Sequence, residues 1–230
     1  MFRKQCFLIL LLGMVCRMEA QDVIVPNRYK QDDFAIHFGF CLGMNMMNFK
    51  VTPNTKDTML ANVSQPNPGF NIQIISNYRL GEYLDLRFLP GISFGERDVN
   101  YYNTNNQLVY SSNKLESNFL EFPLLLKYKS KRMTNIRPYV VTGGNFRIDL
   151  AHNYNEDLGE YLQLKRYDIY YEIGGGIDFY LEYFKLSVEL KYSYGFLNMI
   201  NRISNSRDPG YQNAIQQLRS VLTILSFHFE

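Results

Sequence analysis

The segment FLEFPLLLKY, residues 119–128, separates into two faces when every second residue is taken. The even positions are all apolar, from Leu120 to Tyr128, whereas the odd positions include Glu121, Pro123 and Lys127. A helix is disfavoured because a proline in its interior removes a backbone hydrogen bond and clashes with the preceding turn. Alternation with a period of two is typical of a β-strand. The segment therefore predicts a strand with one apolar and one polar face.

The same alternation recurs along the chain. Several of the alternating segments have ten residues or more, whereas strands of soluble domains have about five or six and tilted membrane-spanning strands about nine to eleven. The sequence therefore predicts an all-β fold, an eight-stranded antiparallel transmembrane β-barrel. The predicted strands cover approximately residues 34–46, 70–80, 84–95, 119–128, 137–150, 167–179, 184–196 and 218–229.

The predicted connections alternate in length. Short turns surround Gly81, Lys131 and Glu182, while the other connections are long and rich in Asn, Ser, Asp and Pro, which favour turns and solvated loops. Short turns on one rim, long loops on the other and an even strand count are typical of outer-membrane barrels, with the short turns in the periplasm. The long connections span residues 52–68, 97–117, 151–163 and 198–217.

A soluble eight-stranded barrel of the lipocalin type also alternates, with its apolar face turned inward. Three features favour the opposite arrangement, with lipid outside. Glycines gather on the charged face, where small residues leave room in a narrow lumen. Aromatic residues gather toward the ends of the apolar face, as at Phe184 and residues 192–196, which suits interfacial girdles. The apolar face is also longer than a ligand-binding core requires.

Residues 1–20 have the composition of a secretory signal peptide. Arg3 and Lys4 precede an apolar run that is too short to span a bilayer as a helix, and Ala20 offers a cleavage site. We therefore expect cleavage after about Ala20, a periplasmic segment at 21–32 and the barrel at 33–230. The first twenty residues carry three basic residues and one acidic residue, so 21 of the 24 basic and 21 of the 22 acidic residues remain. No basic field for nucleic acid is left, and Cys41 is the one remaining cysteine.

The polar face of the predicted strands carries many charges. The lumen of an eight-stranded barrel is just wide enough to be filled by side chains. Because unpaired buried charges are costly, we expect these groups to form a paired network that plugs the barrel. Pro123 is expected to mark a bulge or a locally missing ladder bond. The charged positions are Asp85, Arg87, Glu121, Lys127, Arg147, Glu172, Asp178, Glu189 and Lys191.

Few residues suggest chemistry. His37 starts the first predicted strand and His228 ends the last, so both are expected at the periplasmic rim near Glu230. Two histidines and a carboxylate could bind Zn²⁺, but two histidines at a rim arise easily by chance, and simple polar packing is the favoured interpretation. No nucleophile marks an enzyme, and the glycines at 174–176 lie inside a strand rather than in a phosphate loop. We expect no catalytic, cofactor-binding or metal-binding residues, no cofactor and no small-molecule substrate.

The motif E-x-P-L-L-L-K-Y at 121–128 resembles a signature of Bacteroidota outer-membrane β-barrel proteins. RPYVVTGGNFRIDLA at 137–151 and EIGGGIDFY at 172–180 resemble, more particularly, the PorT family, also called SprT. This resemblance covers essentially the whole chain after residue 20. It implies an accessory role in the type IX secretion system, which exports proteins bearing a C-terminal sorting domain, and in some species a link to gliding motility.

The expected partners are outer-membrane lipid and other secretion-system components. These components would be contacted by the long loops, including Tyr101 and Tyr102, or by the periplasmic segment. The alternative is a stand-alone structural or adhesive barrel of the OmpA or OmpX type. A barrel enzyme is a third possibility.

Overall fold

The computed structural model describes residues 34–54, 59–63, 66–97, 99–103, 108–111, 115–151, 163–201 and 215–230. The predicted signal peptide and the segment 21–32 lie outside these residues. For Tyr101 and Tyr102 only the backbone is described. Within the described residues, no helix is long and apolar enough to cross a membrane.

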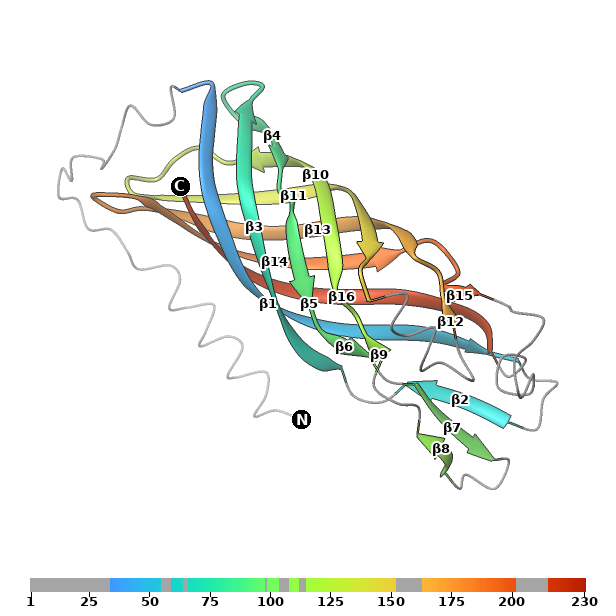
Figure 1. Ribbon diagram of the computed structural model, residues 1–230. Helices are drawn as coiled ribbons and strands as arrows, with labels where there is room; N and C mark the ends of the chain where they lie inside the picture. The colour runs from blue at the N-terminus through green and yellow to red at the C-terminus, as the bar shows by residue number, and fades with distance from the viewer. Residues whose placement is uncertain are drawn as a thin grey trace, which may run out of the picture.

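Nine strands form one closed antiparallel barrel, which confirms the predicted fold class (Figure 1). The first strand, β1, pairs with both β3 and β16 and so closes the wall. Two short strands, β4 and β5, follow one another in the same position of the wall, so the barrel has eight positions. The strands are β1 (Ile36–Pro53), β3 (Asn67–Arg79), β4 (Leu84–Phe88), β5 (Gly91–Phe94), β10 (Phe119–Lys129), β11 (Ile136–Asp149), β13 (Tyr167–Tyr180), β14 (Lys185–Gly195) and β16 (Ile215–Phe229).

The break between β4 and β5 lies opposite Pro123. Both strands pair with β10 in one register, with Leu124 opposite Phe88 and Glu121 opposite Gly91, so no residue is inserted. Neither Pro90 nor Pro123 has an N–H to give to the ladder. The Leu89 N–H still donates to the Pro123 carbonyl at 3.1 Å. Of the two expectations for Pro123, the locally missing ladder bond is therefore correct and the bulge is wrong.

The two faces of the wall are the predicted ones. On the outside, apolar side chains are exposed, for example Phe38 at 69% and Ile74 at 64%. On the inside, charged side chains are fully buried, for example Arg87 and Lys127 at 0%. An apolar exterior around a buried charged interior suits lipid outside the barrel, because a soluble barrel has the reverse arrangement.

The lumen is not entirely polar, which the sequence did not predict. Two small apolar clusters lie inside the wall. One contains Cys41, Ile75, Leu89 and Leu125, and the other contains Met47, Phe119, Tyr170, Leu222 and Ile224. These clusters fill the space between charged side chains, so the interior packs as a solid core.

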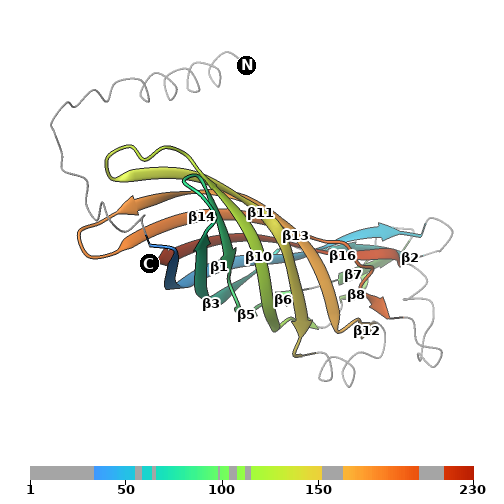
Figure 2. The ribbon, with the colours of Figure 1, turned by 90° about the horizontal axis from the view of Figure 1, so that it is seen from above.

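The barrel has two different rims (Figures 1 and 2). At the rim that we call the turn rim, residues 80–83, 130–135 and 181–184 connect neighbouring strands and the chain reaches Glu230. At the opposite rim, the loop rim, the long connections contain further strands where we expected loops. These are β2 (Met59–Val63), β6 (Glu96–Arg97), β7 (Val99–Asn103), β8 (Leu108–Ser111), β9 (Leu115–Glu116), β12 (Gln163–Leu164) and β15 (Ile200–Asn201).

Some strands of the loop rim pair between connections that are distant in sequence, as β2 does with β7 and β12 with β15, whereas β7 pairs with β8 and β6 with β9 inside one connection. β2, β7 and β8 form a three-stranded sheet that extends beyond the barrel. The composition of these connections had suggested loops because Asn and Ser are frequent. Their short apolar runs, such as Leu108–Tyr110, nevertheless have strand propensity, and pairing with another strand of the loop rim supplies the missing backbone partners.

Candidate functional site: the charged network of the lumen

The interior of the barrel holds a balanced set of charges. Among the residues that the structure describes, eight basic and seven acidic ones are buried, and Glu230 adds an eighth acidic side chain at 0% exposure. Within a strand, side chains alternate between the two faces of the wall, and these charged residues lie on the face that is turned inward. The basic residues are Arg87, Arg97, Lys127, Lys129, Arg137, Arg147, Lys185 and Lys191; the acidic residues besides Glu230 are Asp85, Glu121, Asp149, Asp168, Glu172, Asp178 and Glu189.

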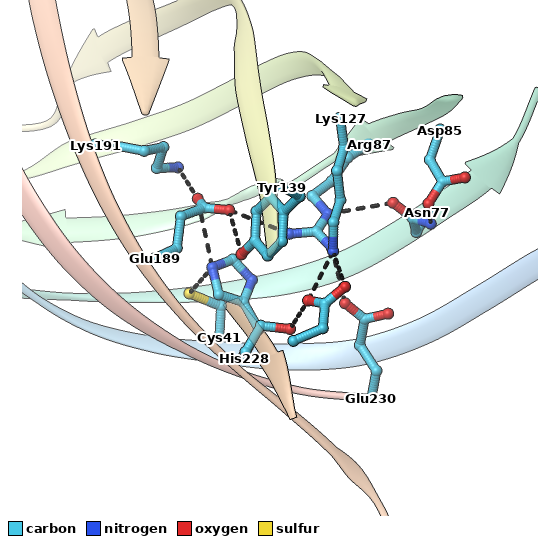
Figure 3. Close-up of polar contacts among 12 residues, drawn as sticks. Cys41, Asn77, Asp85, Arg87, Lys127, Tyr139, Glu189, Lys191, His228 and Glu230 are labelled. Carbon is cyan, nitrogen blue, oxygen red and sulfur yellow. Dashed lines mark hydrogen bonds and ion pairs between the residues drawn. The ribbon is translucent and has the colours of Figure 1, made fainter. Parts of the chain in front are cut away.

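Arg87 on β4 is the centre of the half of the network near the turn rim (Figure 3). Its guanidinium lies 2.9 Å from the Glu230 carboxylate and 3.4 Å from that of Glu189. Its Nε donates to the Asn77 side-chain oxygen at 3.2 Å, and Asn77 in turn donates to Asp85 at 2.9 Å. One arginine therefore joins four side chains from opposite parts of the wall.

Glu189 on β14 is the second centre. It accepts a hydrogen bond from the Tyr139 hydroxyl at 2.8 Å and lies 3.5 Å from the His228 Nε2 and 3.6 Å from the Lys191 Nζ (Figure 3). The Cys41 thiol contacts the same His228 nitrogen at 3.9 Å. Every one of these side chains is buried. The cluster is a closed polar core.

Lys127 and Asp178 form a further ion pair beside these two centres. The lysine Nζ lies 2.8 and 2.9 Å from the two carboxylate oxygens, and the Ser187 hydroxyl donates to Asp178 at 2.5 Å. The same Nζ lies 3.7 Å from the centre of the Tyr139 ring. The charge is thus paired by the carboxylate and further stabilised by the face of an aromatic ring.

The half of the network toward the loop rim is built on Arg147. Its guanidinium lies 3.0 Å from Glu121 and 3.1 Å from Glu172, and it stacks over Tyr170 at 4.2 Å. Lys191 lies 3.4 Å from Glu172 as well as near Glu189, so it connects the two halves. Neutral side chains also donate hydrogen bonds to the carboxylates of Glu121 and Glu172. Gln73 and Ser93 donate to Glu121, and Asn145 and Ser193 donate to Glu172.

Arg97 lies between the network and the loop rim. Its guanidinium carbon lies 4.3 Å from the centre of the Phe49 ring and 5.0 Å from that of Phe119, and the group donates to the hydroxyls of Ser117 and Ser220 at 2.6 and 2.7 Å. Stacking and hydrogen bonds hold the group in a fixed position.

Glu230 follows the last residue of β16 and ties the turn rim together. Its carboxylate lies 2.6 Å from the Lys185 Nζ and 2.9 Å from Arg87. Burial alone would raise the pKa of this carboxyl group, but the two cations outweigh burial and hold its pKa well below the ordinary value. The group is therefore a permanent anion at neutral pH.

The predicted charges form the expected network, and all nine take part in ion pairs with other buried side chains. Sequence reasoning missed Lys129, Lys185, Tyr139 and Arg97. Each of the first three shares strand parity with a predicted lumen residue, and that signal could have identified them. Arg97 falls in a segment that was expected to be a loop.

The register does not bring His37 and His228 together, so their expected proximity is wrong. β1 pairs with β16 only from Phe40 onward, which places His228 opposite Cys41, while His37 lies opposite Asn77 of β3. His228 contacts Glu189, and Glu230 is held by Lys185 and Arg87. Across the described residues, no group of three or more His, Cys, Asp or Glu side chains has the geometry of a metal site.

Comparison with known proteins identifies one family. The family described as outer membrane protein beta-barrel domain matches residues 27–201. No curated protein matches the chain. Among solved structures, Neisserial surface protein A is 12% identical with a TM-score of 0.42, covering 85% of this chain and 98% of that one. OprG from Pseudomonas aeruginosa is 16% identical with a TM-score of 0.41, covering 84% and 91%. The attachment invasion locus protein Ail of Yersinia pestis is 10% identical with a TM-score of 0.37, covering 84% and 96%.

Proposed function

Because this chain belongs to the outer membrane protein β-barrel domain family and is an outer-membrane barrel, we propose that it is a non-catalytic accessory component of the type IX secretion system. In this role it supports the export of proteins that carry a C-terminal sorting domain, and in gliding bacteria it supports motility. The barrel acts as an anchor or assembly factor in the membrane and not as the conduit.

The filled lumen is the observation that supports an anchoring or assembly role over a role as the conduit. Arg87, Glu189, Lys191, Glu172 and Arg147 form a continuous chain of ion pairs along the interior, each at 0–1% side-chain exposure. A solute could pass only after several buried pairs had separated, and each separation leaves an uncompensated charge. A folded cargo protein is far wider than this lumen.

The resemblance to the PorT family supports the proposed role in the type IX secretion system. The residues that carry it lie on β10, β11 and β13, which are neighbours in the wall. Among them, Arg147 pairs with both Glu121 and Glu172 in the lumen. Three residues of the motifs therefore take part in filling the barrel.

The proposal includes an orientation and a processing step. Residues 1–20 are removed after Ala20, residues 21–32 stay in the periplasm, and the turn rim faces the periplasm, as short turns do in outer-membrane barrels. The loop rim faces outside. Partner proteins of the secretion system are contacted through the loops or through the periplasmic segment, and lipid covers the wall.

A stand-alone structural or adhesive barrel is the second candidate. The sheet of β2, β7 and β8 favours it, because this sheet projects from the loop rim beyond the barrel and offers a surface outside the cell. Such a barrel would bind a surface or a neighbouring cell and would leave export unaffected.

A clean deletion strain separates the two candidates. A cargo protein with a C-terminal sorting domain is quantified in the medium and in the periplasm, with an exported protein that lacks this domain as the control. Our proposal expects the cargo to accumulate in the periplasm, the control to be unaffected, and both to be normal after complementation. Normal cargo export together with weaker attachment of the cells to surfaces would support the adhesive barrel instead.

A further inference from the structure

Two cations face each other on the outside of the barrel wall, near the loop rim. β1 and β16 pair with Lys50 directly opposite Arg219. Lys50 is exposed and Arg219 is half-buried, whereas the next residues along the two strands, Phe49 and Ser220, are buried on the lumen side. Like charges directly opposite each other in a sheet are destabilising. An anion beside this pair would therefore stabilise the wall.

Tyr194 on β14 brings the two cations together. β1, β16 and β14 are neighbours in the wall (Figure 1). The Lys50 Nζ lies 5.7 Å from the centre of the Tyr194 ring, and the guanidinium carbon of Arg219 lies 5.9 Å from it. The guanidinium also donates to the Tyr194 hydroxyl at 2.9 Å. Because a cation within about 6 Å of a ring centre is attracted to the ring, both positive charges gather at one place on the outer surface.

The two cations keep hydrogen-bond donors for a further group. Among the residues that the structure describes, no carboxylate forms an ion pair with Lys50 or Arg219. A lysine ammonium has three donors and an arginine guanidinium has five, and Arg219 gives one of its donors to Tyr194. The pair can therefore donate several charge-assisted hydrogen bonds to one anion.

The pair lies at the border between the apolar band of the wall and its polar end. On the same outward face of β1, Met46 is exposed toward the middle of the strand, and Thr52 is exposed toward the loop rim. Thr52 lies opposite Gln217 of β16, which is also exposed. In a membrane barrel the apolar band faces the hydrocarbon and the lipid headgroups lie at its edge. The two cations therefore lie at the height of the headgroups.

We propose that Lys50 and Arg219 form a binding site for the phosphate group of an anionic lipid in the leaflet at the loop rim. The phosphate oxygens accept hydrogen bonds from both side chains, the guanidinium through its planar fork and the ammonium as a point charge. The acyl chains of the lipid lie along exposed apolar side chains such as Met46. This inference goes beyond the proposed function, because a barrel in either candidate role contacts the same lipids.

The border position favours a lipid over a soluble anion. Inorganic phosphate would make the same polar contacts, but it has no acyl chains to cover the apolar band, and each buried CH₂ group adds to the affinity of a lipid. A fatty acid has the acyl chain, but its carboxylate has two oxygens and one charge, whereas a phosphate monoester has three free oxygens and a charge near −2. We therefore expect a phosphate lipid to bind more tightly than either of them.

Native mass spectrometry of the purified barrel in a neutral detergent tests the proposal. The phosphate probe is dioleoyl phosphatidic acid; dioleoyl phosphatidylcholine is the zwitterionic control, and oleate is the anionic lipid without phosphate. We expect phosphatidic acid to bind at least about tenfold more tightly than each of these controls. Its binding should weaken as salt is added, because salt screens exposed charges. Inorganic phosphate at the same concentration should not displace it.

A matched pair of double variants locates the site. Lys50→Gln/Arg219→Gln removes both charges of the pair. Lys131→Gln/Arg132→Gln removes one lysine and one arginine from the turn rim, where the guanidinium carbon of Arg132 lies 3.6 Å from the centre of the Tyr180 ring. Phosphatidic acid should bind the first variant about tenfold more weakly than wild type, and bind the second within about twofold of it. A heat-modifiability gel confirms that both variants fold.

Four outcomes would overturn the proposal. Equal binding of phosphatidic acid and phosphatidylcholine would show that the pair selects no anion, and equally tight binding of oleate would show that phosphate is not preferred. Displacement of the lipid by inorganic phosphate would show a site for a soluble anion. The fourth outcome is equal binding of phosphatidic acid to the two double variants. Each result is independent of cargo export, so it leaves the proposed function to its own test.

Discussion

The Arg87 guanidinium and the Glu230 carboxylate lie 2.9 Å apart, although β4 and the end of β16 are not neighbours in the barrel wall. Two strands, β1 and β3, separate them in the order of the sheet. The contact therefore crosses the lumen, and it joins two residues that are 143 positions apart in the sequence. A barrel whose interior is cross-linked in this way is held closed from inside as well as by its ladder.

Replacement of Arg87 by methionine is expected to destabilise the barrel strongly. The change leaves Glu189 and Glu230 buried with one cation fewer, and removal of one partner from a buried ion pair costs about 3–5 kcal/mol. Urea unfolding of the refolded protein measures the loss. The chain has no tryptophan, so unfolding is followed by tyrosine fluorescence or by gel mobility. Lys131→Gln in an exposed turn is the matched control and should change the unfolding free energy by less than about 0.5 kcal/mol. Equal stability of the two variants would contradict the role given to Arg87.

The faces of the strands were predictable from sequence, whereas the pairing partners were not. A period of two assigns Glu121 and Lys127 to the same face whatever the tertiary structure is. Which charges meet depends on strand register and on distances across the lumen, so the Arg87–Glu230 contact has no local signal. The expected proximity of His37 and His228 was wrong for this reason, because the register places His228 opposite Cys41.

The apolar residues inside the lumen were not predicted from the sequence either. Leu125 lies between Pro123 and Lys127 on the polar face, and its burial at 0% shows that it fills space between charged layers. Alternation counts treat such a residue as an exception. Packing requires it, because charged side chains alone would leave voids.

Neighbouring glycines on β11 should respond in opposite ways to substitution. A Cβ at Gly143 would lie 2.2 Å from the Leu124 carbonyl oxygen and 2.8 Å from the Leu125 Cα, both in the backbone of β10. A Cβ at Gly144 would point outward, with its nearest atom at 3.9 Å. We expect Gly143→Ala to cost about 1–3 kcal/mol and Gly144→Ala to fold normally. Refolding yield and urea midpoints compare the two, and a reversed order would contradict the assignment of the faces.

The unfolding free energy of the barrel should decrease at low pH because the Glu230 carboxylate becomes protonated. Because its pKa is lower in the folded barrel than in the unfolded chain, its contribution is complete above the unfolded value, about pH 4.3, and is lost as the pH falls through the folded pKa. Glu230→Gln should therefore be less stable than wild type at pH 7. The difference between the two should shrink as the pH is lowered below about 4. A difference that stays constant down to pH 2 would show that the charge of Glu230 contributes nothing.

Electrical recording across a planar lipid bilayer tests the central claim most directly, that this outer-membrane barrel is a filled scaffold and not a conduit. The wild-type protein is inserted under conditions in which a porin control gives discrete current steps. We predict that the wild-type barrel gives none, because the ion pairs from Arg87 to Arg147 occupy the lumen. Stable, reproducible current steps from the wild-type protein would show an open path and would contradict the account.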